Sequence, residues 1–325
     1  MKTVVTGAAG HVGANLVRSL ISQGRSVSVL VREDTRAIQG LDIETVKGDV
    51  SQFDLLYKLF KDADVVYHLA AHISLRMDDW QRCDLTNMAG VRNVVEACLQ
   101  TAVKRLVHFS SIHAIKQEPL GFPINENRHL VDTENCPPYD RSKAAGERVV
   151  MKGMEQGLDA IIISPTGIIG PYDYKPSHFG EVLLSLAHRR MPVLIDGGFN
   201  WVDVRDVVTG AIVAEKLAPK GEKYILSGHW ASIHDIAEIM TEIIGIPTPK
   251  LVCPFWVADC GAPVATFLAN LIGKRPLYTN VSLMALKGNR AISCKKAERD
   301  LGYRARPLRE TILDTLNWFK ENKLL

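Results

Sequence analysis

The sequence has little that would link it to a nucleic acid, a disulfide framework or a metal. Its 325 residues carry a formal net charge of only +3, and the basic residues are scattered along the chain. A nucleic-acid partner is therefore not expected. The six cysteines form no Cys-x-x-Cys pair and no cluster with histidines. We therefore expect reduced, buried thiols in a cytoplasmic protein, with no metal site.

A long uninterrupted apolar run is also missing. The most apolar region extends from Leu251 to Ile272, but it is interrupted at Pro254, Asp259, Pro263 and Asn270. A membrane-spanning helix is therefore not expected there. An apolar lid or a helix of a substrate pocket is the favoured interpretation, and contact with a membrane surface is the alternative. No signal peptide is expected, because the first residues already form a core strand.

What the sequence does have is a glycine-rich turn near its start. The apolar run Val4–Val5 predicts a buried strand, and apolar residues recur at helical spacing up to Leu20. Between them stand Gly7, Gly10 and Gly13, at three-residue spacing. Gly7 permits the tight turn, Gly10 lets the backbone approach a pyrophosphate, and Gly13 lets the helix pack closely on the strand. Free N–H groups at the helix start would then face the phosphates.

The end of the second predicted strand indicates which dinucleotide binds. The run from Ser26 to Val31 ends in Arg32, and Arg36 follows. An acidic residue at this position would bind the 2′-hydroxyl of the adenosine ribose, whereas guanidinium groups suit a 2′-phosphate. We therefore predict NADP as the cofactor, with NAD as the alternative. A solvated surface arginine is the alternative interpretation of Arg32.

Two more strands are predicted to complete the cofactor side of the sheet. Residues 44–50 form the third strand and its turn, where Asp49 could accept a hydrogen bond from the adenine amino group or cap the next helix. Residues 63–71 form the fourth, which ends in small residues that let the backbone lie against a flat cofactor. The full predicted cofactor-binding set is Gly7, Ala9, Gly10, His11, Val12, Gly13, Arg32, Asp49, Val50, Leu69, Ala70, Ala71, Lys143, Pro165, Thr166, Gly167 and Ile168.

The predicted chemistry lies at the end of a fifth strand and on the helix that follows it. Residues 105–109 lead into Ser110 and Ser111, at the edge where ligand chemistry collects in parallel sheets. Tyr139 and Lys143 are four residues apart at the start of a helix and share one face. An ordinary exposed helix pair is the alternative interpretation of these two residues.

Each of these side chains has a predicted role. A phenol ordinarily has a pKa of about 10, and a nearby ammonium group lowers it toward the working range. We predict Tyr139 as the acid–base group and Lys143 as the residue that tunes it and binds the nicotinamide ribose. Ser111 is predicted to donate a hydrogen bond to the substrate oxygen.

The alternation of strands and helices up to residue 163 predicts a Rossmann-type, doubly wound parallel α/β sheet with right-handed crossovers. We predict a dinucleotide-binding domain over residues 1–171, completed by about 202–228. A smaller, mostly helical substrate-binding cap is predicted over residues 172–201 and 229–325. The site is expected in the cleft between the two.

Several of these segments resemble the extended short-chain dehydrogenases/reductases, the NAD-dependent epimerase/dehydratase family, over nearly the whole chain. Residues 160–171 resemble the family's R-P-x-x-V-Y-G-P segment, with Ser164 in place of the arginine, and residues 200–208 resemble its F-V-D-V-x-D-V-A segment. The family's Thr-Ser-Ser pattern implies that the catalytic hydroxyl is that of Ser111. The chain is most similar to the dihydroflavonol 4-reductase, cinnamoyl-CoA reductase and 3β-hydroxysteroid dehydrogenase group. The resemblance also implies a homodimer.

Two departures separate the chain from nucleotide-sugar enzymes of that family. Epimerases often carry an arginine just before the V-D-V segment to bind the diphosphate, whereas residues 197–201 contain none. Dehydratases carry an Asp-Glu pair near the serine strand, whereas Ile112 and His113 follow Ser111.

The predicted pocket residues are apolar and aromatic in balance, although each could equally serve packing. They are Ile73, Ser74, His113, Tyr172, Phe179 and Trp201. This balance favours a hydrophobic carbonyl or alcohol over a phosphorylated sugar. The predicted function is an NADP-dependent oxidoreductase that interconverts a ketone or aldehyde and the alcohol on a fairly hydrophobic small molecule. The alternatives are an NAD(P)-dependent nucleotide-sugar epimerase and a non-catalytic dinucleotide sensor or scaffold.

Overall fold

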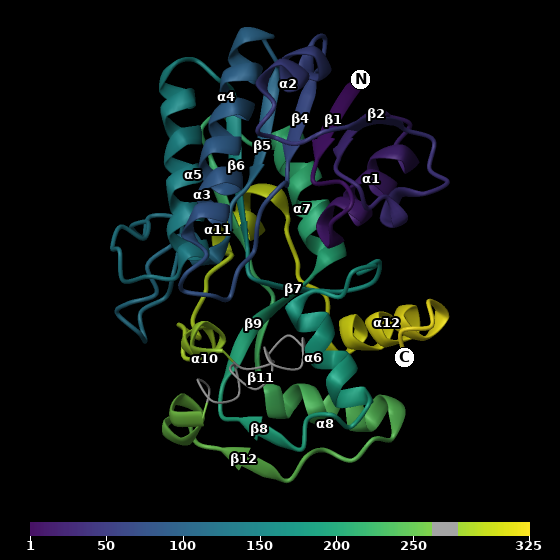
Figure 1. Ribbon diagram of the computed structural model, residues 1–325, viewed down its shortest axis with the longest axis vertical. Helices are drawn as coiled ribbons and strands as arrows, with labels where there is room; N and C mark the ends of the chain where they lie inside the picture. The colour runs from purple at the N-terminus through teal and green to yellow at the C-terminus, as the bar shows by residue number, and fades with distance from the viewer. Residues whose placement is uncertain (262–278) are drawn as a thin grey trace.

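A seven-stranded parallel sheet forms the larger part of the protein, and a smaller part lies beyond one end of it (Figure 1). This computed structural model describes residues 1–261 and 279–325. The strands lie in the order β10-β6-β5-β4-β1-β2-β3. Their bounds are β1 (Lys2–Thr6), β2 (Ser26–Val31), β3 (Glu44–Lys47), β4 (Val65–His68), β5 (Arg105–Phe109), β6 (Ala160–Pro165) and β10 (Lys223–Leu226). The predicted doubly wound parallel sheet is confirmed.

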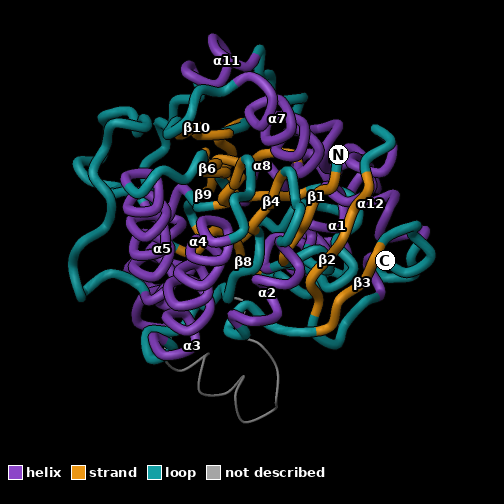
Figure 2. The backbone as a smooth tube through the Cα atoms, turned by 90° about the horizontal axis from the view of Figure 1, so that it is seen from above, coloured by secondary structure: helices purple, strands orange, loops and turns teal. Residues whose placement is uncertain are grey.

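Helices cover both faces of this sheet, which is why its central strands are continuous apolar runs. One face carries α1 (His11–Ser22), α7 (Val204–Leu217) and α11 (Lys295–Leu301). The other face carries α2 (Phe53–Phe60), α4 (Gly90–Gln100) and α5 (Pro138–Glu155). Figure 2 shows α4 and α5 on one side of the strands and α7 on the other. All six residues of β6 are buried as a result.

The chain entering α4 is irregular. A short helix, α3 (Trp80–Asp84), passes through a π-helical turn, η2 (Leu85–Ala89), before α4 begins. Single 3₁₀ turns, η1 (Arg36–Ile38) and η3 (Ile112–Ala114), follow β2 and β5. The π turn brings Asn87 to face both the loop after β4 and helix α5, since Asn87 hydrogen bonds His72 and Ser142.

The smaller part combines helices with two small sheets. Its helices are α6 (His178–Ala187), α8 (Ile233–Ile244), α10 (Asn280–Leu286) and α12 (Leu308–Glu321). Its strands are β7 (Gly167–Ile169), β8 (Val193–Ile195), β9 (Gly198–Asp203), β11 (His229–Ser232) and β12 (Leu251–Cys253). They form the sheets β11-β9-β7 and β12-β8. The prediction of a mostly helical part missed these sheets, because four of their five strands have only three or four residues and leave almost no alternating pattern.

Residues 202–228 contribute to both parts of the protein. Of residues 202–228, β10 joins the sheet beside β6, whereas Val202 and Asp203 lie in β9 of the small sheet. Helix α11 packs into the core of the large sheet although it lies in the stretch assigned to the cap. The proposed domain bounds therefore stay a prediction.

The apolar region 251–272 is described only in part. Residues 251–253 form β12, which pairs with β8, and residues 262–272 lie outside the described residues. Within the described part of the chain, no helix is both long and apolar enough to cross a bilayer.

Candidate active site

One large cavity runs from the glycine-rich turn to the smaller part of the protein, with a volume of about 1980 Å³. It opens at the carboxyl ends of the parallel strands, where the strand order reverses between β1 and β4 and where ligands bind in this kind of sheet. Every residue of the predicted cofactor set lines it, and so do Ser111, Tyr139 and Lys143. The structure thus brings together residues from seven separate segments, although their roles are still predictions.

The glycine turn forms a cradle that a side chain would fill. Gly7 has a left-handed φ of +76°, and a Cβ there would lie 2.6 Å from the backbone nitrogen of Ala70. A Cβ on Gly13 would lie 2.2 Å from the carbonyl oxygen of Gly7. Helix α1 begins directly after Gly10 with no side-chain cap, so its first N–H groups stay available to an anion. These observations fit the pyrophosphate of a dinucleotide.

His11 has a second task at the start of this helix. Its Nε2 lies 3.1 Å from the Gly170 carbonyl oxygen and 3.0 Å from that of Pro171. Asn15 also donates to the Pro171 carbonyl, at 3.0 Å. The cradle is therefore tied to the loop after β7, which leads from the large sheet toward the smaller part.

Of the two arginines after β2, Arg32 lines the cavity and Arg36 does not. Arg36 is held in a bidentate pair by Asp34, with an Nη2–Oδ2 distance of 2.7 Å. Arg32 is exposed on the cavity wall, and within residues 1–261 and 279–325 its guanidinium has no carboxylate partner. Asp49 also lines the cavity, and its Oδ1 accepts from the Ser51 N–H at 3.0 Å. Asp49 thus shapes the turn before α2, whose N-cap position is Gln52.

The predicted triad meets in the middle of the cavity. Pro138 is the first residue of α5, a position that suits its missing N–H, and the next residue is Tyr139. Ser111 is the N-cap of the η3 turn, two residues after the end of β5, and its side chain acts on the Tyr139 phenol. Lys143 lies one turn further along α5, and its Nζ donates to the Phe109 carbonyl oxygen at 2.5 Å.

The protonation of these groups follows mainly from burial. Burial raises the pKa of Tyr139 to about 12 against the lowering effect of its Ser111 hydrogen bond, and nearby Asp140 and Cys83 add to the rise. Burial lowers the pKa of Lys143 to about 8, and the charge of Glu147 opposes that change. The predicted lowering of the tyrosine pKa by Lys143 is not seen: burial dominates, and the opposing contribution comes from Ser111. A protonated phenol at neutral pH is suited to donating a proton to a carbonyl oxygen.

His113 and Asp140 form a pair beside the Tyr139 ring. The His113 Nδ1 lies 3.4 Å from Asp140 Oδ1, and the His113 and Tyr139 rings meet edge to face with centroids 5.9 Å apart. Burial disfavours the protonated imidazole, but the Asp140 charge and hydrogen bond outweigh it and raise the pKa of His113. The pair places an ionisable group on the cavity wall next to the phenol.

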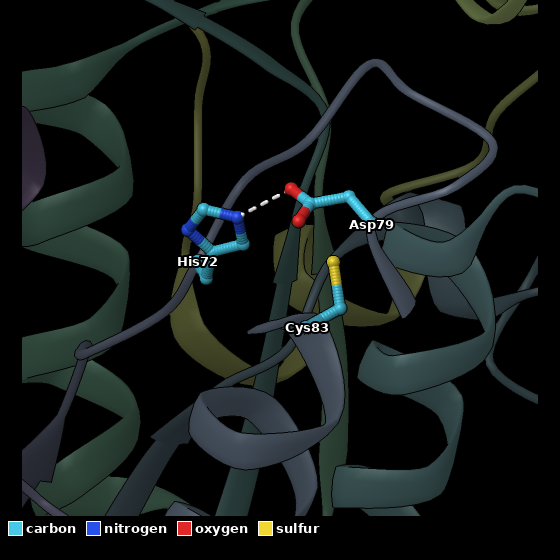
Figure 3. A group of neighbouring side chains, drawn as sticks. All are labelled: His72, Asp79 and Cys83. Carbon is cyan, nitrogen blue, oxygen red and sulfur yellow. Dashed lines mark hydrogen bonds and ion pairs between the residues drawn. The ribbon is translucent and has the colours of Figure 1, made fainter. Parts of the chain in front are cut away.

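His72, Asp79 and Cys83 cluster where the loop after β4 meets α3 (Figure 3). His72 Nε2 lies 2.7 Å from Asp79 Oδ2, Asp79 also accepts from Ser74, and Cys83 hydrogen bonds Ser142 on α5. Burial raises the pKa of the Cys83 thiol to about 11, so the thiol keeps its proton at neutral pH. The arrangement is a hydrogen-bonded cluster that ties the loop to α5.

The structure separates the predicted pocket residues into two groups. Ile73, Ser74, His113 and Phe179 line the cavity, whereas Tyr172 and Trp201 do not, which corrects their assignment. Tyr172 packs under Arg18, whose Cζ lies 4.5 Å from the ring centroid. Trp201 is 1% exposed, and its Nε1 donates to the Ala231 carbonyl oxygen at 2.9 Å. Because Trp201 lies 4.7 Å from the Phe179 ring, it supports the cavity wall from behind.

Sequence reasoning missed a buried polar network behind Lys143. Glu147 is 2% exposed and accepts from Ser110 Oγ at 2.6 Å and from Lys223 Nζ at 2.5 Å. His68 and His108 stack on neighbouring strands with centroids 5.5 Å apart. The spacing of Glu147 four residues after Lys143 was a usable signal, because it places both on one helix face.

Comparison with known proteins gives the family. The NAD dependent epimerase/dehydratase family matches residues 3–226. The chain is 32% identical to "Sterol demethylase protein B" of Methylococcus capsulatus over 100% of both chains. It is 31% identical to a "Putative dihydroflavonol 4-reductase" of Synechocystis, over 98% of this chain and 94% of that one. The crystal structure of gox2253 superposes with a TM-score of 0.86 at 32% identity, over 98% of each chain.

These likenesses agree with the glycine cradle, the parallel sheet and the position of the cavity. They confirm the predicted resemblance to extended short-chain dehydrogenases/reductases and to the dihydroflavonol 4-reductase-like group. The chain belongs to the NAD-dependent epimerase/dehydratase family, and it is an NAD(P)-dependent enzyme that acts on CH–OH groups.

Proposed function

We propose that the protein is an NADP-dependent oxidoreductase that interconverts a ketone or aldehyde and the corresponding alcohol on a fairly hydrophobic small molecule. The observation that carries the proposal is that Ser111, Tyr139 and Lys143 line one cavity with the glycine cradle, where Ser111 acts on the Tyr139 phenol and opposes the rise of its pKa. Lys143 completes the triad from the same helix face as Tyr139.

Tyr139, Ser111 and Lys143 each have a separate role in the reaction. When bound, the nicotinamide supplies or accepts the hydride at the carbonyl carbon. In reduction, the Tyr139 phenol gives its proton to the substrate oxygen, and the Ser111 hydroxyl stabilises the negative charge that develops there. The Lys143 ammonium favours the phenolate that Tyr139 becomes. In oxidation, the same phenolate takes the proton back from the alcohol.

The NADP preference is supported by Arg32. Its guanidinium lies on the cavity wall at the end of β2 and has no carboxylate partner in the described part of the chain. A free guanidinium suits the additional phosphate of NADP. Lys175 also lines the cavity and acts electrostatically on Asp34, so a second cation lies in this region.

The hydrophobic substrate is supported by the far end of the cavity. Its walls there include six apolar side chains, beside polar ones of the same elements; the apolar residues are Phe179, Val182, Met191, Phe199, Ile233 and Leu286. Such walls favour an apolar ligand body with a few polar groups that set its orientation. The names of two similar proteins, a sterol demethylase protein and a putative dihydroflavonol reductase, agree with a polycyclic substrate of this kind.

A nucleotide-sugar epimerase is the second candidate, because the matching family is named for epimerases. The absence of an arginine from residues 197–201 weighs against it. Family membership sets aside the non-catalytic sensor. A homodimer in the cytoplasm is the setting that we expect for the enzyme.

The test is a panel of ketones, aldehydes and sterol-like alcohols, followed by NADPH absorbance, with NADH in parallel. We expect NADPH-linked turnover of an apolar compound. Tyr139→Phe should lower kcat by about 1000-fold and leave NADPH affinity nearly unchanged. Tyr57→Phe, at a half-exposed tyrosine of α2 away from the cavity, is the matched control. Full activity of Tyr139→Phe, or UDP-sugar interconversion without net NADPH consumption, would refute the proposal.

A further inference from the structure

The buried network behind Lys143 connects three elements of the large sheet and its helices. Glu147 on α5 accepts from Ser110 Oγ at the end of β5 and from Lys223 Nζ on β10. Ser110 directly precedes Ser111, and Glu147 lies one turn after Lys143. One carboxylate therefore joins the strand end that carries the serine to the helix that carries the tyrosine and lysine.

In the described part of the chain, Lys143 has one negatively charged neighbour, and its other ionisable neighbours are neutral or positive. Among the described residues, Glu147 supplies the negative charge that favours the Lys143 ammonium. The charge of Lys143 acts on His68 of β4 and His108 of β5. Tyr139 lies one turn before Lys143 on α5, and Lys223 of β10 pairs with Glu147. Burial, helped by Lys143, lowers the pKa of His68 to about 3 and that of His108 well below its ordinary value. Both imidazoles are therefore neutral, and neither can replace the charge of Glu147.

Apart from Glu147, the groups near Lys143 offer little to stabilise its ammonium charge. Neither ring nitrogen of His108 has a hydrogen-bond partner among the described residues, and only Nδ1 of His68 has one, at 2.7 Å from Thr6 Oγ1. The Lys143 Nζ itself donates to one backbone carbonyl, that of Phe109. A buried ammonium with so few partners depends strongly on a nearby carboxylate.

We propose that Glu147 is a positioning residue of the reaction: it fixes the Ser110–Ser111 strand end against helix α5 and keeps Lys143 in its ammonium form. The proposal rests on the Ser-Tyr-Lys function proposed above. Glu147 has no direct contact with the reacting atoms in this scheme. It acts through Ser110 on the position of Ser111, and through its charge on Lys143.

A second buried glutamate offers a matched control. Glu215 on α7 is 8% exposed, accepts from the Tyr67 hydroxyl at 3.0 Å and pairs with Arg25 at 2.6 Å. Like Glu147, it joins one hydroxyl and one cation and does not itself line the cavity, but its partners Tyr67 and Arg25 do not line the cavity either, whereas Ser110 does. Glu215→Gln should therefore lower the melting temperature without changing the chemistry.

The experiment compares Glu147→Gln, Glu147→Asp and Glu215→Gln in the full-length enzyme. Lysines labelled with ¹³C at Cε are titrated by NMR, with the Lys143 signal identified by its loss in Lys143→Arg. In Glu147→Gln we expect the Lys143 titration to fall by about one pH unit and kcat at pH 7.5 to fall roughly tenfold, with little change in KM. Glu147→Asp should restore the titration in part. Glu215→Gln should leave both values unchanged.

A further variant separates the two effects of Glu147. Ser110→Ala should lower kcat severalfold while leaving the Lys143 titration unchanged, because it removes the hydrogen bond and keeps the charge. An unchanged Lys143 titration in Glu147→Gln, or an equal loss of kcat in Glu215→Gln, would overturn the proposal. If Glu147→Gln does not fold, Glu147→Asp and Ser110→Ala still decide it. Full activity of Tyr139→Phe would instead refute the triad, and the NMR titration would still report on Glu147.

Discussion

The two ends of the cavity are built from different parts of the chain. At the sheet end, backbone atoms of the glycine turn and of the loop after β4 approach so closely that a single added carbon would collide with them. At the far end, the walls are side chains on α6, β9 and α10. A wall of backbone is fixed by the fold, whereas a wall of side chains can change by substitution. We therefore expect the first end to be restricted to a dinucleotide and the second to vary with the substrate.

The largest effect should come from adding one carbon to the backbone wall. A Cβ on Gly13 would lie 2.2 Å from the Gly7 carbonyl oxygen and 2.7 Å from the Ala8 Cα, so α1 must shift. Overpacking of this kind costs about 1–3 kcal/mol, and we expect Gly13→Ala to weaken NADPH binding by roughly 10- to 100-fold. Isothermal titration calorimetry measures the affinity, and circular dichroism checks the fold. Wild-type affinity in a folded Gly13→Ala protein would contradict the cradle.

A smaller effect should follow from removing the Arg32 guanidinium, which we assign to cofactor binding. Arg32→Ala should lower kcat/KM with NADPH about tenfold and leave the value with NADH nearly unchanged, because only NADP carries the additional phosphate. Arg36→Ala is the control, since Asp34 already holds that guanidinium. Equal losses of kcat/KM with NADPH and NADH would mean that Arg32 does not bind the 2′-phosphate.

At the far end, a substitution should weaken substrate binding and leave cofactor binding unchanged. Phe179 lines the cavity and packs edge to face on Phe199 and Trp201, with both centroid distances 4.7 Å. Phe179→Ala should raise KM for a bulky apolar substrate about threefold to tenfold, through lost apolar contact, and leave NADPH affinity unchanged. Phe122→Ala removes a phenyl ring that is 65% exposed and serves as the control. A loss of NADPH affinity in Phe179→Ala would show that the two ends are coupled.

The difference between the two ends of the cavity also explains how much of the site could be predicted from the sequence. The cofactor end and the Tyr139–Lys143 pair were predictable, because glycine spacing and helical spacing translate directly into geometry. Trp201 could not be placed, since its indole faces Ala231 and the core of the smaller part through strand pairing across distant segments. Glu147 was within reach through its spacing from Lys143, but its partners Ser110 and Lys223 come from strands that only the fold brings together.

The smallest effect concerns the His113–Asp140 pair, where the two ends of the cavity meet. The folded protein raises the pKa of His113 above its ordinary value of about 6.5. Its stabilising contribution is therefore fully present below about pH 6.5 and disappears as the pH rises through the raised value. The His113 side chain is 32% exposed, so solvent screening keeps the contribution below about 1 kcal/mol. Relative to wild type, His113→Asn should lower the melting temperature by about 1–2 °C at pH 5.5 and by almost nothing at pH 9. His129→Asn, at an exposed histidine, should show no such pH dependence. A constant difference across this range would mean that His113 contributes packing alone and that its pairing with Asp140 adds no stability.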